Sequence, residues 1–231
     1  MSRIVRGLFR YRGWLADRSV VIAGMGRCGT TLLYDALRRR GFRGSRFVPS
    51  QQEVQRFRTG HVYKTHDFPP PSLPDYVRLI FLFGNPMDIV ISTHRKINEW
   101  GALHHRHLRS ALFQPNDSVF QHDTLRLHEH FEQWYRRQPF PFLSLRYESL
   151  FDAPTRDALE HYLGFHVPLP QFRKRDADWS NHPQRDRLWR LYGDLYEAVN
   201  RVEDVRLWRP LRGSSAERAV GAAATGRRTI Q

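Results

Sequence analysis

The chain of 231 residues has one cysteine and only three lysines. A single cysteine, Cys28, excludes an intrachain disulfide and is typical of a reducing compartment, so we expect a cytoplasmic protein. Because lysine and arginine together number 37, arginine carries nearly all of the positive charge. Ammonium and guanidinium groups are not interchangeable at a reacting phosphate or sulfonate. The lysines, at positions 64, 96 and 174, are therefore informative about function.

Long apolar runs are also absent. No run reaches the ~20 residues that a helix needs to span a bilayer, and arginines interrupt the apolar residues of segment 1–18, unlike the core of a signal peptide. With 40% hydrophobic and 13% aromatic residues, the chain can still build a packed core. We predict one domain over residues 19–212, preceded by the basic segment 1–18 and followed by a disordered tail over 213–231.

The charge balance indicates anionic partners. The formal net charge is +14, which suits nucleic acid, an acidic membrane surface or an acidic substrate. Segment 1–18 either packs across the domain or lies on an anionic membrane, and packing is the favoured interpretation. We expect no specific recognition of nucleic acid.

The most informative segment is residues 19–33, which read SVVIAGMGRCGTTLL. The apolar run ending at Ala23 predicts a buried strand, and the glycine-bracketed loop from Gly24 to Gly29 can turn backbone N–H groups inward. A helical pattern then begins near Gly29. Loop amides and the positive end of a helix together favour a bound anion, so the layout predicts a phosphate-binding loop.

The loop lacks the lysine of a nucleoside triphosphate site. That lysine would directly follow the last glycine and reach the β- and γ-phosphates. Thr30 stands there instead, and Arg27 is the only cation inside the loop. The loop therefore favours an anion other than a triphosphate, and a P-loop nucleotide kinase or NTPase stays open as an alternative.

Further polar side chains follow two predicted strands. Residues 61–65 predict a short strand that places Lys64 and His66 at its carboxyl end, where open α/β sheets bind ligands. Residues 77–83 are almost uniformly apolar, which is typical of a strand buried on both faces. The helix that follows carries Ser92, and a basic cluster over 173–175 stands beside an aromatic residue.

In this order, the segments resemble the motifs of the sulfotransferase superfamily that uses 3′-phosphoadenosine-5′-phosphosulfate (PAPS). The matching segments are 26–31 (the 5′-phosphosulfate loop), 64–69 (the segment with the catalytic base), 84–92 (the 3′-phosphate site), 146–150 (an Arg-Tyr-Glu element) and 172–174 (a late Arg-Lys element). The resemblance covers residues 19–182. It implies an α/β fold of P-loop, sulfotransferase-like three-layer architecture, with a mainly parallel central sheet flanked by helices.

The resemblance also implies a reaction and the residues that carry it. His66 is expected to be the general base, with Lys64 and Arg27 stabilising charge on the sulfonate and the bridging oxygen. Tyr147 and Trp179 are candidates for contact with adenine, although Trp179 could equally belong to the core. The residues expected to bind the nucleotide are Gly26, Arg27, Cys28, Gly29, Thr30, Thr31, Ser92, Tyr147, Arg173 and Lys174. PAPS would be the donor and PAP the product, no metal is expected, and a small molecule, glycan or lipid would accept the group on a hydroxyl or amine.

Two positions depart from the family pattern. The family has an arginine on the 3′-phosphate where this chain has Gly84, and a glycine where this chain has Arg175. One charge-assisted hydrogen bond contributes about 1.5–3 kcal/mol, so an unreplaced arginine would weaken nucleotide binding roughly ten- to a hundredfold. A catalytically weakened, polyanion-binding protein of the same fold is therefore a further alternative.

The rest of the chain alternates predicted strands and helices, which favours a mainly parallel sheet with helices on both faces. Strands are predicted at 20–23, 61–65, 77–83 and 141–145, and helices at 30–40, 51–58, 85–96, from 123 onward, 155–163 and 183–199. The proline-rich stretch 69–74 cannot form regular structure. Residues 98–117 show no clear pattern and are a candidate lid on the acceptor side.

Overall fold

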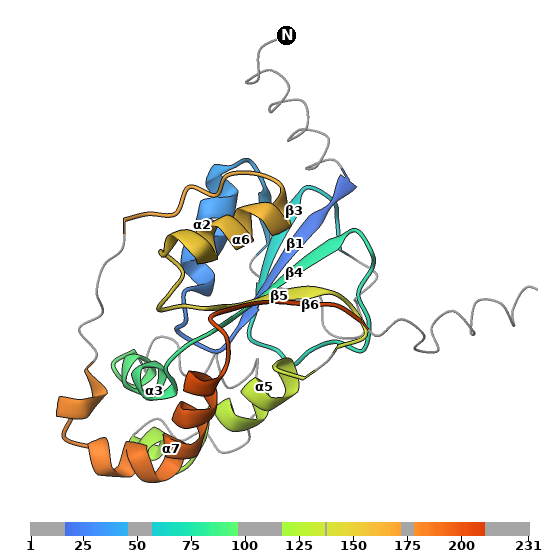
Figure 1. Cartoon of the computed structure of the whole chain (residues 1–231). Coiled ribbons are helices and arrows are strands. Elements are labelled where there is room, and N and C mark those ends of the chain that lie inside the picture. Colours follow the sequence, from blue (N-terminus) through green and yellow to red (C-terminus); the bar gives the residue numbers. More distant parts are fainter. Residues whose placement is uncertain (1–16, 46–56, 97–116, 137, 172–177, 211–231) are drawn as a thin grey trace, which may run out of the picture.

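The computed structural model describes residues 17–45, 57–96, 117–136, 138–171 and 178–210 (Figure 1). Its strands are β1 (Ser19–Gly24), β2 (Arg43–Ser45), β3 (His61–Thr65), β4 (Val77–Phe83), β5 (Phe142–Arg146) and β6 (Val205–Trp208). Its helices are α2 (Thr30–Arg39), α3 (Pro86–His94), α5 (Leu127–Trp134), α6 (Ala153–Leu163) and α7 (Arg185–Arg201), with short 3-10 helices η3 (Asp117–Phe120) and η4 (Trp179–Asn181). The predictions for the N-terminal segment, the candidate lid, the basic cluster and the tail fall outside these ranges, as does most of the helix predicted at 51–58.

The strands form one six-stranded sheet in the order β2-β3-β1-β4-β5-β6. Every neighbouring pair is parallel except β5 and β6, which pair antiparallel. The predicted class, α/β with a mainly parallel central sheet, is confirmed. All residues of β1 and all but one of β4 are buried, as expected for central strands that pack helices on both faces.

Helices cover the two faces of the sheet unequally. Helices α2 and α6 lie over the same face (Figure 1). The segments that follow them meet through the rings of Phe42 and Phe165, whose centroids are 5.9 Å apart. Helix α5 packs against the other face, where the Trp134 indole stacks on Phe81 of β4 with centroids 5.1 Å apart. The buried side chains of α5, which are Leu127, His130, Phe131 and Trp134, therefore form its packing face.

Three elements differ from the sequence prediction. Strands β2 and β6 were not predicted, because three and four residues are too few for a pattern and such short edge strands depend on pairing with their neighbours. Helix α5 begins at Leu127 rather than near Asp123. The backbone of Arg126 is left-handed, with φ 52°, and Asp123 caps the helix from outside it.

The topology brings the candidate segments to one edge of the sheet. Strand β1 lies between β3 and β4, so the chain leaves it toward one side and later crosses to the other. In parallel sheets, ligands bind at the carboxyl ends of the strands beside such a switch point. The loop after β1, the end of β3 and the residues after β4 and β5 all lie at this edge.

Candidate functional site

The loop between β1 and α2 is held against the end of β4. The backbone N–H of Met25 donates to the Leu82 carbonyl at 3.0 Å. Cys28 is fully buried, and its thiol donates to the carbonyl of Leu82 at 3.1 Å and to that of Met25. A buried thiol that acts as a donor is protonated, so Cys28 is a structural part of the loop rather than a reactive group.

Two positions in the loop fit only glycine. A Cβ at Gly24 would lie 2.7 Å from the carbonyl oxygen of Leu82, and a Cβ at Gly29 would lie 2.6 Å from the Cε2 atom of Tyr147. Gly29 also has φ 86°, in the left-handed region. The predicted glycine bracket is therefore required both by close approach and by backbone conformation.

The start of helix α2 is electrostatically suited to an anion. Gly29 is its N-cap, no side chain of the described residues caps it, and its first turn contains no acidic residue. The first-turn amides have no acceptor within the helix, and the helix dipole adds positive potential there. Thr30 and Thr31 occupy this first turn, as predicted.

Lys64 and His66 both reach the loop or the start of α2. The ammonium group of Lys64 donates to the Thr31 hydroxyl at 2.9 Å. Since Thr65 pairs with Ala23 in the sheet, His66 emerges beside the first residue of the loop. The Nδ1 atom of His66 lies 2.7 Å from the Gly24 carbonyl oxygen.

That contact fixes the tautomer of His66. A carbonyl oxygen can only accept, so Nδ1 carries the proton, and the lone pair of the neutral ring is at Nε2. The side chain is 6% exposed. His66 therefore sits at the base of the loop, with its orientation fixed by a backbone group, as is usual for histidines that exchange protons.

Arg27 connects the loop to helix α3. Its backbone is left-handed, with φ 62°, and its Nε donates to the Ser92 hydroxyl at 3.0 Å. Helix α3 starts at a defined point because the Asn85 side chain accepts from the Met87 amide at 3.0 Å and Pro86 occupies its first turn. The predicted 5′ and 3′ phosphate segments thus contact each other directly.

The Glu148 carboxylate lies beside Gly84, the position at which the motif that the sequence resembles has an arginine. Glu148 accepts a hydrogen bond from the backbone N–H of Asn85 at 3.0 Å. A Cβ at Gly84 would lie 2.9 Å from the Glu148 Oε1 atom. Gly84 therefore lacks the arginine of the motif and also has a negatively charged side chain next to it. The sequence could not reveal this contact, because Gly84 follows β4 and Glu148 follows β5.

Other predicted residues are placed elsewhere or outside the described structure. Arg146 forms an ion pair with Asp204 at 2.6 Å, which joins β5 to the turn before β6. Trp179 stacks on Trp189 at 5.9 Å and meets Tyr196 at 5.4 Å, which supports its interpretation as a packing residue. Arg173 and Lys174 lie outside the described residues.

Sequence reasoning missed two side chains of α5 that contact the His66 segment. Trp134 donates its indole N–H to the Asp67 carbonyl at 3.0 Å, and the Nε2 atom of His130 lies 3.2 Å from the same oxygen. Burial lowers the pKa of His130 to about 4, against the opposing influence of the nearby Asp67 and His66 carbonyls. From the sequence, Trp134 is one of the regularly spaced apolar residues of a helix and His130 is an ordinary helix residue, so neither contact could be predicted.

The described part of the chain has neither a cluster of metal-ligating side chains nor a membrane-spanning helix. It contains no group of three or more His, Cys, Asp or Glu side chains placed to hold a metal ion. None of its helices combines the length and the apolar character required to cross a membrane.

Comparison with known proteins gives a distant structural likeness and no match in sequence. No protein-family model matches the chain, and no curated protein matches it in sequence. Among solved structures, the crystal structure of mouse sulfotransferase SULT7A1 complexed with PAP resembles it with a TM-score of 0.45 and 15% identity. That likeness covers 83% of this chain and 93% of the other.

Proposed function

We propose that this chain is a sulfotransferase that moves a sulfuryl group from PAPS to a hydroxyl or amine of an acceptor. The observation that carries the proposal is the set of contacts around the glycine loop. His66 contacts the loop backbone, Lys64 contacts the first turn of α2, and Arg27 contacts α3. A candidate base and two cations from separate elements therefore meet around one anion-binding loop.

The loop fits the phosphosulfate end of the donor. Its amides, Thr30 and Thr31 would hold the 5′-phosphate, where glycines leave room for close approach. Ser92 would contact the 3′-phosphate, with Arg173 and Lys174 as further candidates. When bound, PAPS supplies a sulfuryl group whose bond to the bridging oxygen breaks as the acceptor oxygen or nitrogen bonds to sulfur, leaving PAP.

The side chains of this protein would then stabilise the negative charge that develops and accept one proton. Nε2 of His66 takes the proton of the acceptor, and its Nδ1–H stays on the Gly24 carbonyl, which keeps the ring oriented. Lys64 and Arg27 balance the negative charge that spreads over the sulfonate and the leaving oxygen. In this scheme the cations that stabilise the transferred group are Lys64 on β3 and Arg27 in the loop, which agrees with the absence of a lysine after Gly29.

Calorimetric titration with adenosine 3′,5′-bisphosphate tests the donor site. We expect this nucleotide to bind more tightly than ATP with Mg²⁺, and binding to weaken in the Lys64→Ala variant. Lys96→Ala is the matched control, because Lys96 is exposed just beyond the end of α3. A preference for ATP with Mg²⁺ would indicate a kinase or NTPase. Steeply salt-dependent binding of any polyanion, with no preference for the bisphosphate, would indicate a polyanion-binding protein.

A second experiment tests the reaction. The protein is incubated with PAPS labelled in its sulfuryl group and a panel of alcohols, phenols, amines, glycans and lipids, and transfer of label is measured. Transfer to at least one acceptor, lost in His66→Ala, is the expected result. Tight bisphosphate binding with no transfer to any member of the panel would leave only a nucleotide-binding role.

A further inference from the structure

One backbone carbonyl beside the candidate base accepts two hydrogen bonds from helix α5. The Asp67 carbonyl is 3.0 Å from the indole nitrogen of Trp134 and 3.2 Å from Nε2 of His130. These two residues are four apart, so they project from one face of the helix. Because the acceptor is a carbonyl, Nε2 of His130 must carry its proton. We name His130 and Trp134 together the α5 clamp.

The α5 clamp cannot easily change its orientation. Both side chains are fully buried. Phe81 of β4 stacks on Trp134 at 5.1 Å and contacts the His130 ring at 5.9 Å. The centroid of the His130 ring is also 5.6 Å from that of Phe68, so the clamp contacts the residue that follows Asp67 as well.

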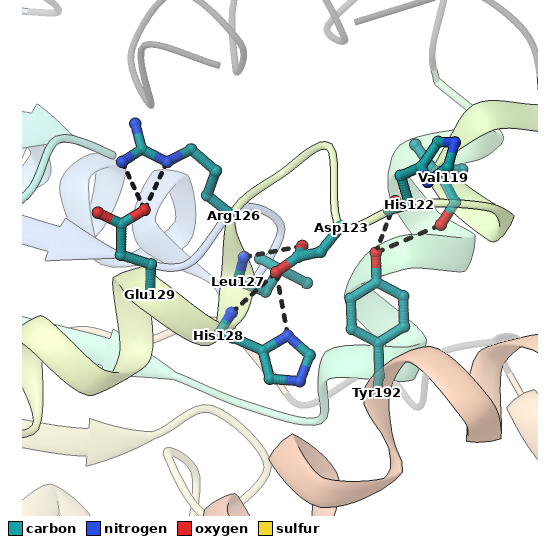
Figure 2. Close-up of polar contacts among 8 residues, drawn as sticks. All are labelled: Val119, His122, Asp123, Arg126, Leu127, His128, Glu129 and Tyr192. Carbon is teal, nitrogen blue, oxygen red and sulfur yellow. Dashed lines mark hydrogen bonds and ion pairs between the residues drawn. The ribbon is translucent and has the colours of Figure 1, made fainter. Parts of the chain in front are cut away.

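Helix α5 is itself fixed at its first turn (Figure 2). The Asp123 carboxylate accepts from the Leu127 amide at 2.9 Å and from the His128 amide at 3.1 Å, and it contacts the His128 ring at 3.0 Å. The Arg126 guanidinium lies 4.6 Å from the centroid of the Phe68 ring. The helix end and the His66 segment are thus joined by a second, independent contact.

We propose that His130 and Trp134 are positioning residues that hold the His66–Asp67 peptide so that the His66 ring stays on the Gly24 carbonyl. The inference rests on the proposed function, in which His66 accepts the proton of the acceptor. A clamp on the next carbonyl restricts the backbone of His66, while the contact with Gly24 restricts its ring. Together they preserve the tautomer with the basic lone pair at Nε2. Because the ring is already oriented, little conformational entropy is lost when it takes the proton.

The test uses substitutions that remove one N–H and keep an aromatic ring. Trp134→Phe deletes the indole donor to Asp67, and His130→Phe deletes the imidazole donor. The matched control is Trp208→Phe in β6, which deletes an indole donor to the Ser144 hydroxyl at 3.0 Å. The readout is the ¹⁵N imidazole spectrum of His66 in the full-length protein, assigned by difference from His66→Gln.

We expect the wild type and Trp208→Phe to show His66 with its proton at Nδ1. Trp134→Phe and His130→Phe should show a mixture of tautomers, with the turnover number falling about tenfold and the affinity for adenosine 3′,5′-bisphosphate unchanged. If one clamp variant does not fold, the other decides. An unchanged His66 spectrum in a folded clamp variant would overturn the positioning role, even if activity falls.

The failure of the proposed function looks different. If the wild type neither binds the bisphosphate nor transfers label, the proposed sulfotransferase function is wrong. The proposed role of the α5 clamp in that reaction is then wrong as well. The His66 spectrum, which needs no ligand, still reports in that case whether the α5 clamp holds the ring.

Discussion

The burial of His130 predicts a specific loss of stability in mild acid. The side chain is fully buried, and its pKa is lowered from 6.5 to about 4, mainly because burial disfavours the charged ring. Arg126 lowers this pKa further, while Asp123 and the carbonyls of Asp67 and His66 raise it. Between these two pKa values the unfolded chain binds a proton that the folded chain does not.

The sign and size of the effect follow from that difference. The stabilisation is fully present above the unfolded pKa and is lost as the pH falls toward the folded pKa. Lowering the pH from about 7.5 to about 5.0 should remove about 2 kcal/mol of the free energy of unfolding through this single group, approaching about 3 kcal/mol near the folded pKa.

Urea unfolding followed by circular dichroism measures this loss. The free energy of unfolding is compared at the two pH values for the wild type and for His130→Gln, which keeps an N–H donor but cannot titrate in this range. The variant should be less stable at high pH and should lose about 2 kcal/mol less on acidification. His161→Gln removes a histidine exposed on α6 and should keep the full His130 contribution. Equal losses in the wild type and His130→Gln would refute the reasoning.

Four other substitutions test the candidate site. His66→Ala should lower the turnover number by about 10²–10⁴ while leaving bisphosphate affinity nearly intact, as measured by steady-state kinetics and calorimetry; an unchanged rate would remove the role as base. Gly29→Ala should abolish nucleotide binding, because it combines φ 86° with a collision against Tyr147. Its control, Gly164→Ala at φ 78° on the C-cap of α6, should cost only about 1 kcal/mol of stability. Glu148→Gln should tighten bisphosphate binding several-fold by removing a negative charge beside the candidate 3′-phosphate site. Gly84→Arg should increase the affinity more in the Glu148→Gln variant than in the wild type. If neither substitution increases the affinity, the 3′-phosphate binds elsewhere.

The sequence predicted the elements whose patterns are local. The continuous apolar runs of β1 and β4 identified central strands, and the glycine bracket from Gly24 to Gly29 identified the loop, because chain turning and close approach both demand glycine there. The order of the strands predicted that Lys64 and His66 lie at the carboxyl-end edge of the sheet, beside the glycine loop. That expectation needed only the rule that parallel strands end together.

Tertiary structure decided the contacts that join distant segments. Arg27 and Ser92 are 65 residues apart, Asn85 and Glu148 are 63 apart, and Asp67 and Trp134 are 67 apart. A hydrophobic pattern reports which face of an element is buried, but a hydrogen bond between separate elements depends on the register and orientation of both. The sequence therefore determined a glycine loop at the edge of a parallel sheet with a histidine beside it. Only the packing of α5 and of the β5 strand end against that edge decided what holds the histidine and which charge faces Gly84.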